Sequence, residues 1–353
     1  MIRLTLRQFR TQAAAAFALL LLVAILLIST RPHLAHIYGV YAKAQAACVA
    51  SDDCGHTNIV IGQLDRLLEH LDLVLVALPA LLGAFWGAPL ISRELENGTH
   101  RLAWTQSVTR TRWLTVKLAI VGVASVVTTG LMSLMFTWWS SPSDRTSMNR
   151  FDVALFGQRN VAPLGYAAFG FALGVTAGAL IRRTLPAMAA TLGGFLGVRL
   201  AFTYLVRPHL IAPKHLTTTL AAVARGFGSS NGGPPTIFAS ASGLPNAWIY
   251  STRIVDASGH GLTSEVAVNA CPSLATPFTR SGSGSVRAVP APADARDAFQ
   301  SCITNLSSTY HGLVTYQPAD RYWIFQIYET AIFLATAALL SGLCFYLIRR
   351  RAT

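Results

Sequence analysis

Two ionisable residues, Arg199 and Glu329, stand inside long apolar runs of the chain. A charge within a bilayer is costly unless it is paired or faces water, so residues of this kind pair with each other or share a polar cavity. Each lies about seven residues from the same predicted end of its run, or roughly 10 Å along an α-helix. We therefore predict that Arg199 and Glu329 pair or share a cavity. Such a pair could fix two helices or meet a substrate.

The sequence lacks the motifs of intrinsic catalysis. A phosphate-binding loop needs glycines followed by Gly-Lys, and none of the three lysines follows a glycine. Neither GxSxG nor HExxH occurs. The pairs His33 with His36 and His209 with His215 lack the accompanying carboxylates or cysteines of a zinc site. We therefore expect no enzyme activity, no metal and no cofactor in this chain.

Composition indicates an integral membrane protein. Hydrophobic residues make up 52% of the chain and charged residues 12%, and the mean hydropathy is +0.46. A helix needs about 20 apolar residues to cross a bilayer, and six runs approach that length. They cover 11–30, 71–91, 114–139, 161–181, 186–206 and 322–348. The predicted fold is an all-α polytopic membrane protein with six transmembrane helices.

Arginines predict the orientation, because basic residues near the ends of spans are retained in the cytoplasm. They occur before span one, between spans two and three, between spans four and five, and at the chain end. Both termini, the surface helix 1–10 and the tail 349–353 are therefore predicted to be cytoplasmic. The net charge of +13 is scattered over these ends, so anionic lipid explains it better than nucleic acid does.

The long segment 207–321 is predicted to be an extracellular module between spans five and six. Its β-forming runs and one helix-like stretch indicate a small mixed α/β fold. Four cysteines are predicted on this side: Cys48, Cys54, Cys271 and Cys302. We hypothesise the short-range pairs 48 with 54 and 271 with 302, although four cysteines allow three connectivities.

Glycines recur every four residues in two spans. Gly170, Gly174 and Gly178 lie in span four, and Gly193 with Gly197 lies in span five. Small residues at this spacing allow helices to approach closely. The contacts could lie within one subunit or between two copies.

One compact polar segment, 92–117, separates spans two and three and mixes acidic, basic and aromatic residues. Its acidic residues could meet basic residues of a partner, and its apolar side chains could anchor the contact. An ordinary solvated loop is the alternative. The residues that we assign to partner coupling are Arg93, Glu94, Leu95, Glu96, Asn97, Gly98, Thr99, Arg101, Leu102 and Trp104.

This segment resembles the coupling helix of ABC-2 type permeases, in which an acidic pair precedes Gly-Thr and an Arg-containing stretch returns into span three. The layout is similar too: a basic N-terminal surface helix, six spans and a large insertion before span six. The chain looks most like type V exporter-like, actinobacterial-type stand-alone permeases.

The resemblance implies a permease subunit that forms the substrate pathway of an ABC exporter in the bacterial cell membrane. It implies a separate ATPase subunit as partner, with ATP and Mg²⁺ bound there, and a second permease copy in a homodimer. The alternative is a membrane-anchored receptor or structural interaction protein whose outer module binds a ligand or partner. The substrate stays open.

Overall fold

The computed structural model describes residues 2–51, 76–97, 109–145, 150–229, 234–241, 243–275 and 295–351. The chain divides into two compact units. The first comprises Met1–Ile211 with Tyr322–Thr353, and the second comprises Ala212–Arg321. The predicted boundary at 207 therefore shifts by a few residues, and Arg207 belongs to the helical unit.

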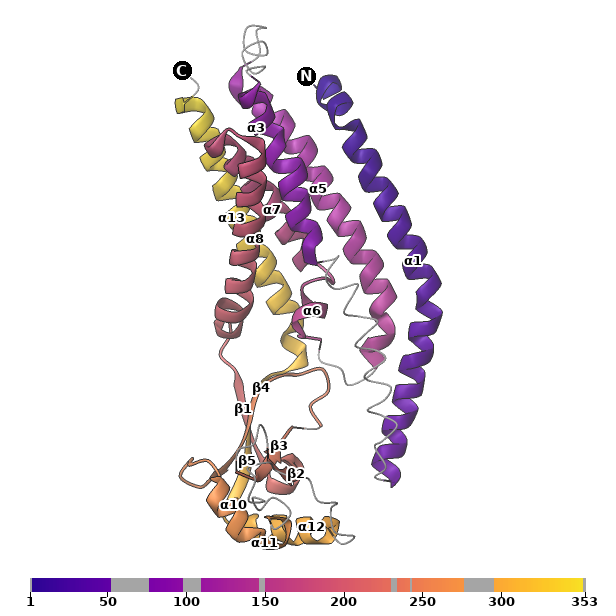
Figure 1. Ribbon diagram of the computed structural model, residues 1–353, viewed down its shortest axis with the longest axis vertical. Coiled ribbons are helices and arrows are strands. Elements are labelled where there is room, and N and C mark those ends of the chain that lie inside the picture. The colour runs from indigo at the N-terminus through magenta and orange to yellow at the C-terminus, as the bar shows by residue number, and fades with distance from the viewer. Residues whose placement is uncertain are drawn as a thin grey trace, which may run out of the picture. The chain divides into compact units, whose positions relative to one another are not determined.

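In the described part of the first unit, six helices are long and apolar enough to cross a membrane, as the six predicted spans require (Figure 1). Both chain termini lie at one end of this bundle, called here the terminal end (Figure 1). The main helices are α1 (Ile2–Ser51), α3 (Ala88–Glu96), α5 (Arg110–Ser140), α7 (Ala162–Ile181), α8 (Thr184–Ala201) and α13 (Tyr322–Arg351). Two of the spans include a π-helical turn: η1 (Gly83–Gly87) precedes α3, and η3 (Phe202–Val206) follows α8. Shorter elements are η2 (Ser141–Arg145), α6 (Val153–Phe156) and η4 (Arg207–His209).

Helix α1 is longer than predicted. The expected surface helix 1–10 and span 11–30 form one continuous helix, Ile2–Ser51, whose apolar section runs over Arg10–Lys43. The sequence between them carries no helix-breaking glycine or proline, so nothing separates the two parts. Cys48 consequently lies on α1 and not in a loop, whereas Cys54 falls outside the described residues.

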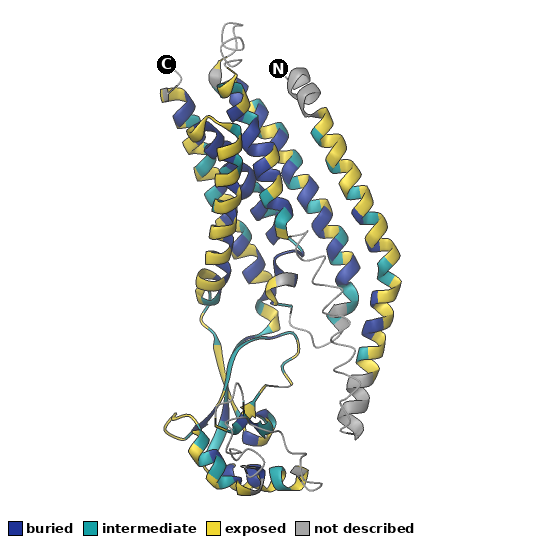
Figure 2. Cartoon of the chain, in the orientation of Figure 1, coloured by how far each residue is buried: buried dark blue, intermediate teal, exposed yellow. Residues whose placement is uncertain are grey.

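Helix α7 and the second span are the most enclosed of the six, whereas α1 and α8 are exposed along much of their length (Figure 2). The glycines of α7 allow the second span to pack directly on the α7 backbone. A Cβ atom on Gly170 would lie 2.6 Å from the carbonyl oxygen of Pro79, and one on Gly178 would lie 2.5 Å from that of Ala88. These contacts lie within one chain. A Cβ on Gly193 or Gly197 would have no neighbour within 4 Å among the described atoms.

The second unit has the mixed α/β composition predicted for this segment. A three-stranded antiparallel sheet has the order β1-β5-β4, and a smaller sheet pairs β2 with β3. Short helices pack around a core that includes Ile254, Ile303 and Val314. Cys271 and Cys302 are joined by a disulfide. The strands are β1 (Lys214–Thr219), β2 (Ala224–Gly228), β3 (Thr236–Ala239), β4 (Trp248–Asp256) and β5 (Tyr310–Gln317). The helical elements are α9 (Leu220–Val223), α10 (Ser264–Ala270), α11 (Pro272–Ala275), α12 (Ala295–Leu306) and η6 (Ala319–Arg321).

Candidate functional site

A fully buried carboxylate, Glu329 of α13, forms ion pairs with two arginines inside the bundle. Arg199 of α8 donates from Nη1 to Glu329 Oε1 at 3.0 Å, so the structure brings the two predicted intramembrane charges together. Arg207 donates from Nε to Oε2 at 2.8 Å and from Nη2 to Oε1 at 2.9 Å. The hydroxyl of Tyr166 on α7 donates to the same Oε1. We call Glu329, Arg199, Arg207 and Tyr166 the Glu329 cluster.

The π-helical turn η3 explains how two arginines eight residues apart reach one carboxylate. In a regular α-helix, eight residues turn about 80° past two full turns, so Arg199 and Arg207 would diverge. A π-helical turn contains more residues, which reduces this offset. Thr203, midway between them, accepts a hydrogen bond of 2.9 Å from Arg199 Nη1. Therefore η3 aligns both guanidinium groups on the side of the helix that faces α13.

The Glu329 cluster holds two positive groups against one negative group, and aromatic rings offset part of the excess charge. Arg199 lies 4.0 Å from the ring centre of Tyr166, and Arg207 lies 4.3 Å from that of Phe156. Cation–π contacts of desolvated guanidinium groups are favourable. Arg207 Nη1 is buried without a hydrogen-bond partner among the described residues. Since Arg199 is 7% exposed and both Arg207 and Glu329 are 0% exposed, the cluster is a buried contact between helices that solvent does not reach.

Hydrogen bonds between uncharged groups extend this buried contact along α13. Gln326 donates from Nε2 to the carbonyl oxygen of Phe156 at 2.9 Å and accepts from the backbone N–H of Ala162 at 2.9 Å. Asn160 Nδ2 donates to the hydroxyl of Tyr322 at 2.8 Å. The start of α13 is therefore bonded to the segment between α6 and α7.

A second group of charges lies toward the terminal end, where α3 meets α5 and α8. Lys117 of α5 forms an ion pair with Glu94 of α3, and its Nζ lies 4.8 Å from the ring centre of Trp113. Glu96 accepts hydrogen bonds from the backbone N–H of Thr184 at 3.1 Å and from its hydroxyl at 2.8 Å. The first N–H groups of a helix lack partners within it, and Glu96 supplies one for α8. We call Glu94, Lys117, Glu96 and Thr184 the α3 contacts.

These contacts give the predicted acidic pair partners within the chain. Sequence reasoning assigned Glu94 and Glu96 to basic residues of a partner, but both carboxylates bind groups of this chain. Leu95 is half-buried against the hydrophobic core, while Arg93 and Asn97 are exposed. The other predicted coupling residues lie outside the described residues: Gly98, Thr99, Arg101, Leu102 and Trp104.

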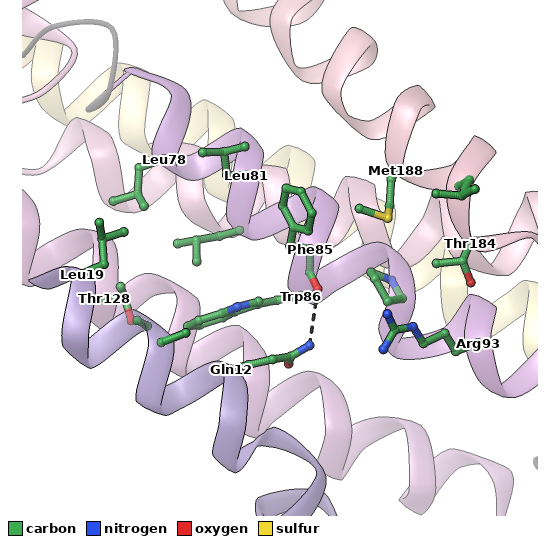
Figure 3. A pocket seen from close by; sticks show the side chains of 15 residues that line it. Gln12, Leu19, Leu78, Leu81, Phe85, Trp86, Arg93, Thr128, Thr184 and Met188 are labelled. Carbon is green, nitrogen blue, oxygen red and sulfur yellow. Dashed lines mark hydrogen bonds between the residues drawn. The ribbon is translucent and has the colours of Figure 1, made fainter. Parts of the chain in front are cut away.

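A cavity of about 500 Å³ lies among α1, the η1–α3 span, α5 and α8. Its walls are mainly apolar, and Figure 3 shows Arg93 and Thr184 at one end and Leu19 and Leu78 at the other. Gln12 of α1 donates to the carbonyl oxygen of Phe85, within the π-helical turn η1, at 3.5 Å. We call this space the Arg93 cavity.

Sequence reasoning missed Arg207, Tyr166 and Gln12. The sequence predicts that Arg207 begins the outer module, because an arginine at the end of an apolar run ordinarily marks the membrane surface. Arg207 lies eight residues after Arg199, and this spacing places both side chains on one face only if a π-helical turn lies between them. In the described part of the chain, no group of three His, Cys, Asp or Glu side chains could hold a metal ion.

Comparison with protein families gives one match. The family described as ABC-2 membrane transporter related matches residues 17–207, which include α7, α8 and both arginines of the Glu329 cluster. The search of curated proteins and the search of solved structures return no match.

Proposed function

Since the chain belongs to the ABC-2 membrane transporter related family and is thus an ABC-2 type permease, we propose that it serves an exporter driven by a separate ATPase subunit. The ATPase binds ATP and Mg²⁺, and this chain binds neither. Two copies of the permease form the substrate pathway. Segment 92–117 connects the pathway to the ATPase and lies in the cytoplasm together with both termini.

The observation that carries this proposal is the pair of α3 contacts at the base of segment 92–117. The Glu94–Lys117 ion pair connects α3 to α5, and the hydrogen bonds from Thr184 to Glu96 connect α3 to α8. A displacement of the segment therefore moves groups on α3, α5 and α8 together. Switching transporters work by moving packed helices between two discrete arrangements.

The distribution of charge supports the proposed orientation. Arg93, Arg112, Arg182, Arg183 and Arg349 follow or precede spans at the terminal end, as basic residues do on the cytoplasmic side. Both termini belong to this end of the bundle (Figure 1).

Affinity purification of the full chain from its host membrane tests the proposal. A P-loop ATPase should copurify, and its ATP hydrolysis should rise when the permease is added in lipid vesicles. Transport out of cells, or into inside-out vesicles, should require ATP. Purification without any ATPase would contradict the proposal and favour a membrane-anchored receptor or structural protein.

The α3 contacts allow a sharper test with matched variants. Lys117→Met removes the partner of Glu94, whereas Lys43→Met removes the same charge from an exposed position on α1. We expect Lys117→Met alone to lower the ATPase stimulation while the ATPase still copurifies. Equal loss in both variants would show that the contact with α5 has no specific role.

A further inference from the structure

We infer that the Arg93 cavity binds a membrane lipid with an acidic head group, with the head at Arg93 and an acyl chain along the apolar wall. The inferred binding site rests on the shape, lining and charge of the cavity. Only the additional step, that this lipid is the transported molecule, rests on the proposed function.

The shape and lining of the cavity fit an acyl chain. Its volume of about 500 Å³ is within the range of small-molecule sites, which are mainly apolar with a few placed polar groups. Leu78, Leu82 and Trp86 recur every four residues and form one buried wall on the second span. Exposed Leu19 and Phe85 lie at the rim, where a bilayer would supply lipid chains.

Among the described residues, the one charged group of the cavity lining, Arg93, lies at the terminal end of the cavity. Thr184 lies there too, whereas Gln12 lies near the middle beside Phe85 and Thr128 lies at the Leu19 end. Leu78 lies fifteen residues from Arg93 on the same span. This separation corresponds to about 22 Å of helix, which exceeds half of a hydrocarbon core about 30 Å thick. A lipid of the leaflet at the terminal end would therefore place its head group beside Arg93.

Charge specifies the head group. The nearest acidic residues along the chain are Glu94 and Glu96, and these bind Lys117 and Thr184. No carboxylate lies within 4.0 Å of the Arg93 guanidinium among the described residues. A guanidinium at the edge of an apolar cavity is complementary to a phosphate or carboxylate oxygen. Arg93 is thereby assigned to the lipid and not to the ATPase.

Photo-crosslinking of the full chain in phosphatidylcholine nanodiscs tests this inference. The probe is phosphatidylglycerol with a diazirine on one acyl chain, and the neutral comparison is phosphatidylcholine with the same labelled chain. Mass spectrometry locates the labelled residues. We expect phosphatidylglycerol to label the cavity wall about tenfold more than phosphatidylcholine, as a charge-assisted contact would give.

Two pairs of variants separate the cavity from general attraction to a basic surface. Arg93→Gln should reduce labelling by phosphatidylglycerol to the level of phosphatidylcholine, whereas Arg349→Gln, at the same end of the bundle, should leave it unchanged. Ala15→Trp fills the cavity from α1 and should abolish labelling of its wall by both lipids. Ala13→Trp places the same ring on the exposed α1 surface away from the cavity lining and should leave labelling unchanged.

Equal labelling by the two lipids would overturn the inference, as would equal losses in Arg93→Gln and Arg349→Gln. Copurification of the ATPase is measured on the same preparations. Selective lipid labelling without an ATPase would support the binding site and refute the proposed exporter. Copurification of an ATPase without selective lipid labelling would support the proposed exporter and refute the lipid-binding site.

Discussion

The Glu329 cluster and the α3 contacts use similar side chains, but solvent reaches the carboxylates of the α3 contacts only. In the Glu329 cluster, one carboxylate with no exposed surface receives bonds from three other residues. In the α3 contacts, each carboxylate serves a single neighbouring helix, and the Glu94 side chain keeps 20% of its surface exposed. Breaking a buried ion pair costs far more than breaking one at the surface.

This difference divides the bundle into a rigid part and an adjustable part. Helices α7, α8 and α13 meet at the Glu329 cluster, so they are expected to move as one body. Beyond Ser92, where the close packing on α7 ends, α3 is connected to α5 through Glu94 and to α8 through Glu96, and solvent reaches both carboxylates although Lys117 is buried. In the proposed coupling, a displacement of segment 92–117 therefore changes the α3 contacts first and leaves the Glu329 cluster intact.

Loss of Glu329 should give the largest effect. Glu329→Gln leaves two buried guanidinium groups without a counter-charge, and such losses cost about 3–5 kcal/mol in protein interiors. We expect a large drop in the melting temperature of the detergent-purified chain. Size-exclusion chromatography after heating measures how much folded protein remains at each temperature. Tyr328→Phe, on the exposed side of the same helix, is the matched control.

The double variant Glu329→Gln with Arg207→Met provides a second check. It removes one of the two uncompensated charges, so part of the lost stability should return. If Glu329→Gln had the same melting temperature as the parent chain, the Glu329 cluster would not hold α7, α8 and α13 together as one rigid body.

Close packing of α7 should give the next largest effect. Gly170→Ala places a methyl group against the carbonyl of Pro79, and this backbone atom cannot rotate away. Overpacking of this kind costs about 1–3 kcal/mol. Gly197→Ala adds the same methyl group where no atom lies within 4 Å. The same heating assay should show a lower melting temperature for Gly170→Ala alone, and equal values would contradict a rigid α7 interface.

These two regions also show what can be predicted from the sequence. Hydropathy predicts the six spans, because crossing a bilayer constrains length and composition directly. Equal depth of Arg199 and Glu329 predicts their proximity, because desolvated charges need partners. Arg207 could not be placed, since its position depends on the π-helical turn at 202–206 and no propensity rule predicts that turn.

The acidic pair illustrates a different limit. The pattern Glu94-Leu95-Glu96 shows that carboxylates flank an apolar residue at the end of a span, but it does not show which groups they meet. Lys117 lies 23 residues away and Thr184 lies 88 residues away from their respective partners. Contacts over such separations depend on how the helices pack, which the local pattern does not encode.

A smaller effect on stability is expected at Lys117, combined with a clear effect on coupling. Lys117→Met leaves Glu94 able to meet water, so the melting temperature should fall less than in Glu329→Gln. Stimulation of the partner ATPase should fall about fivefold or more, which is in the usual range of coupling between sites. Adding Glu94→Gln to this variant should cause little further loss, because the two residues act as one contact. Additive losses would show that they act separately.

The smallest effect is expected at Glu96, which receives its hydrogen bonds at an exposed position. Glu96→Gln keeps an acceptor near Thr184 but removes the negative charge from the N-terminus of α8, where it is favourable. Amide hydrogen exchange over 184–187 should accelerate by about twofold to fivefold, as the loss of a helix cap gives. Glu265→Gln, in the first turn of α10, should leave exchange at 184–187 unchanged. Exchange that stayed unchanged in Glu96→Gln as well would mean that α3 and α8 are not coupled through Glu96, and the adjustable part of the bundle would then consist of the contact between α3 and α5 alone.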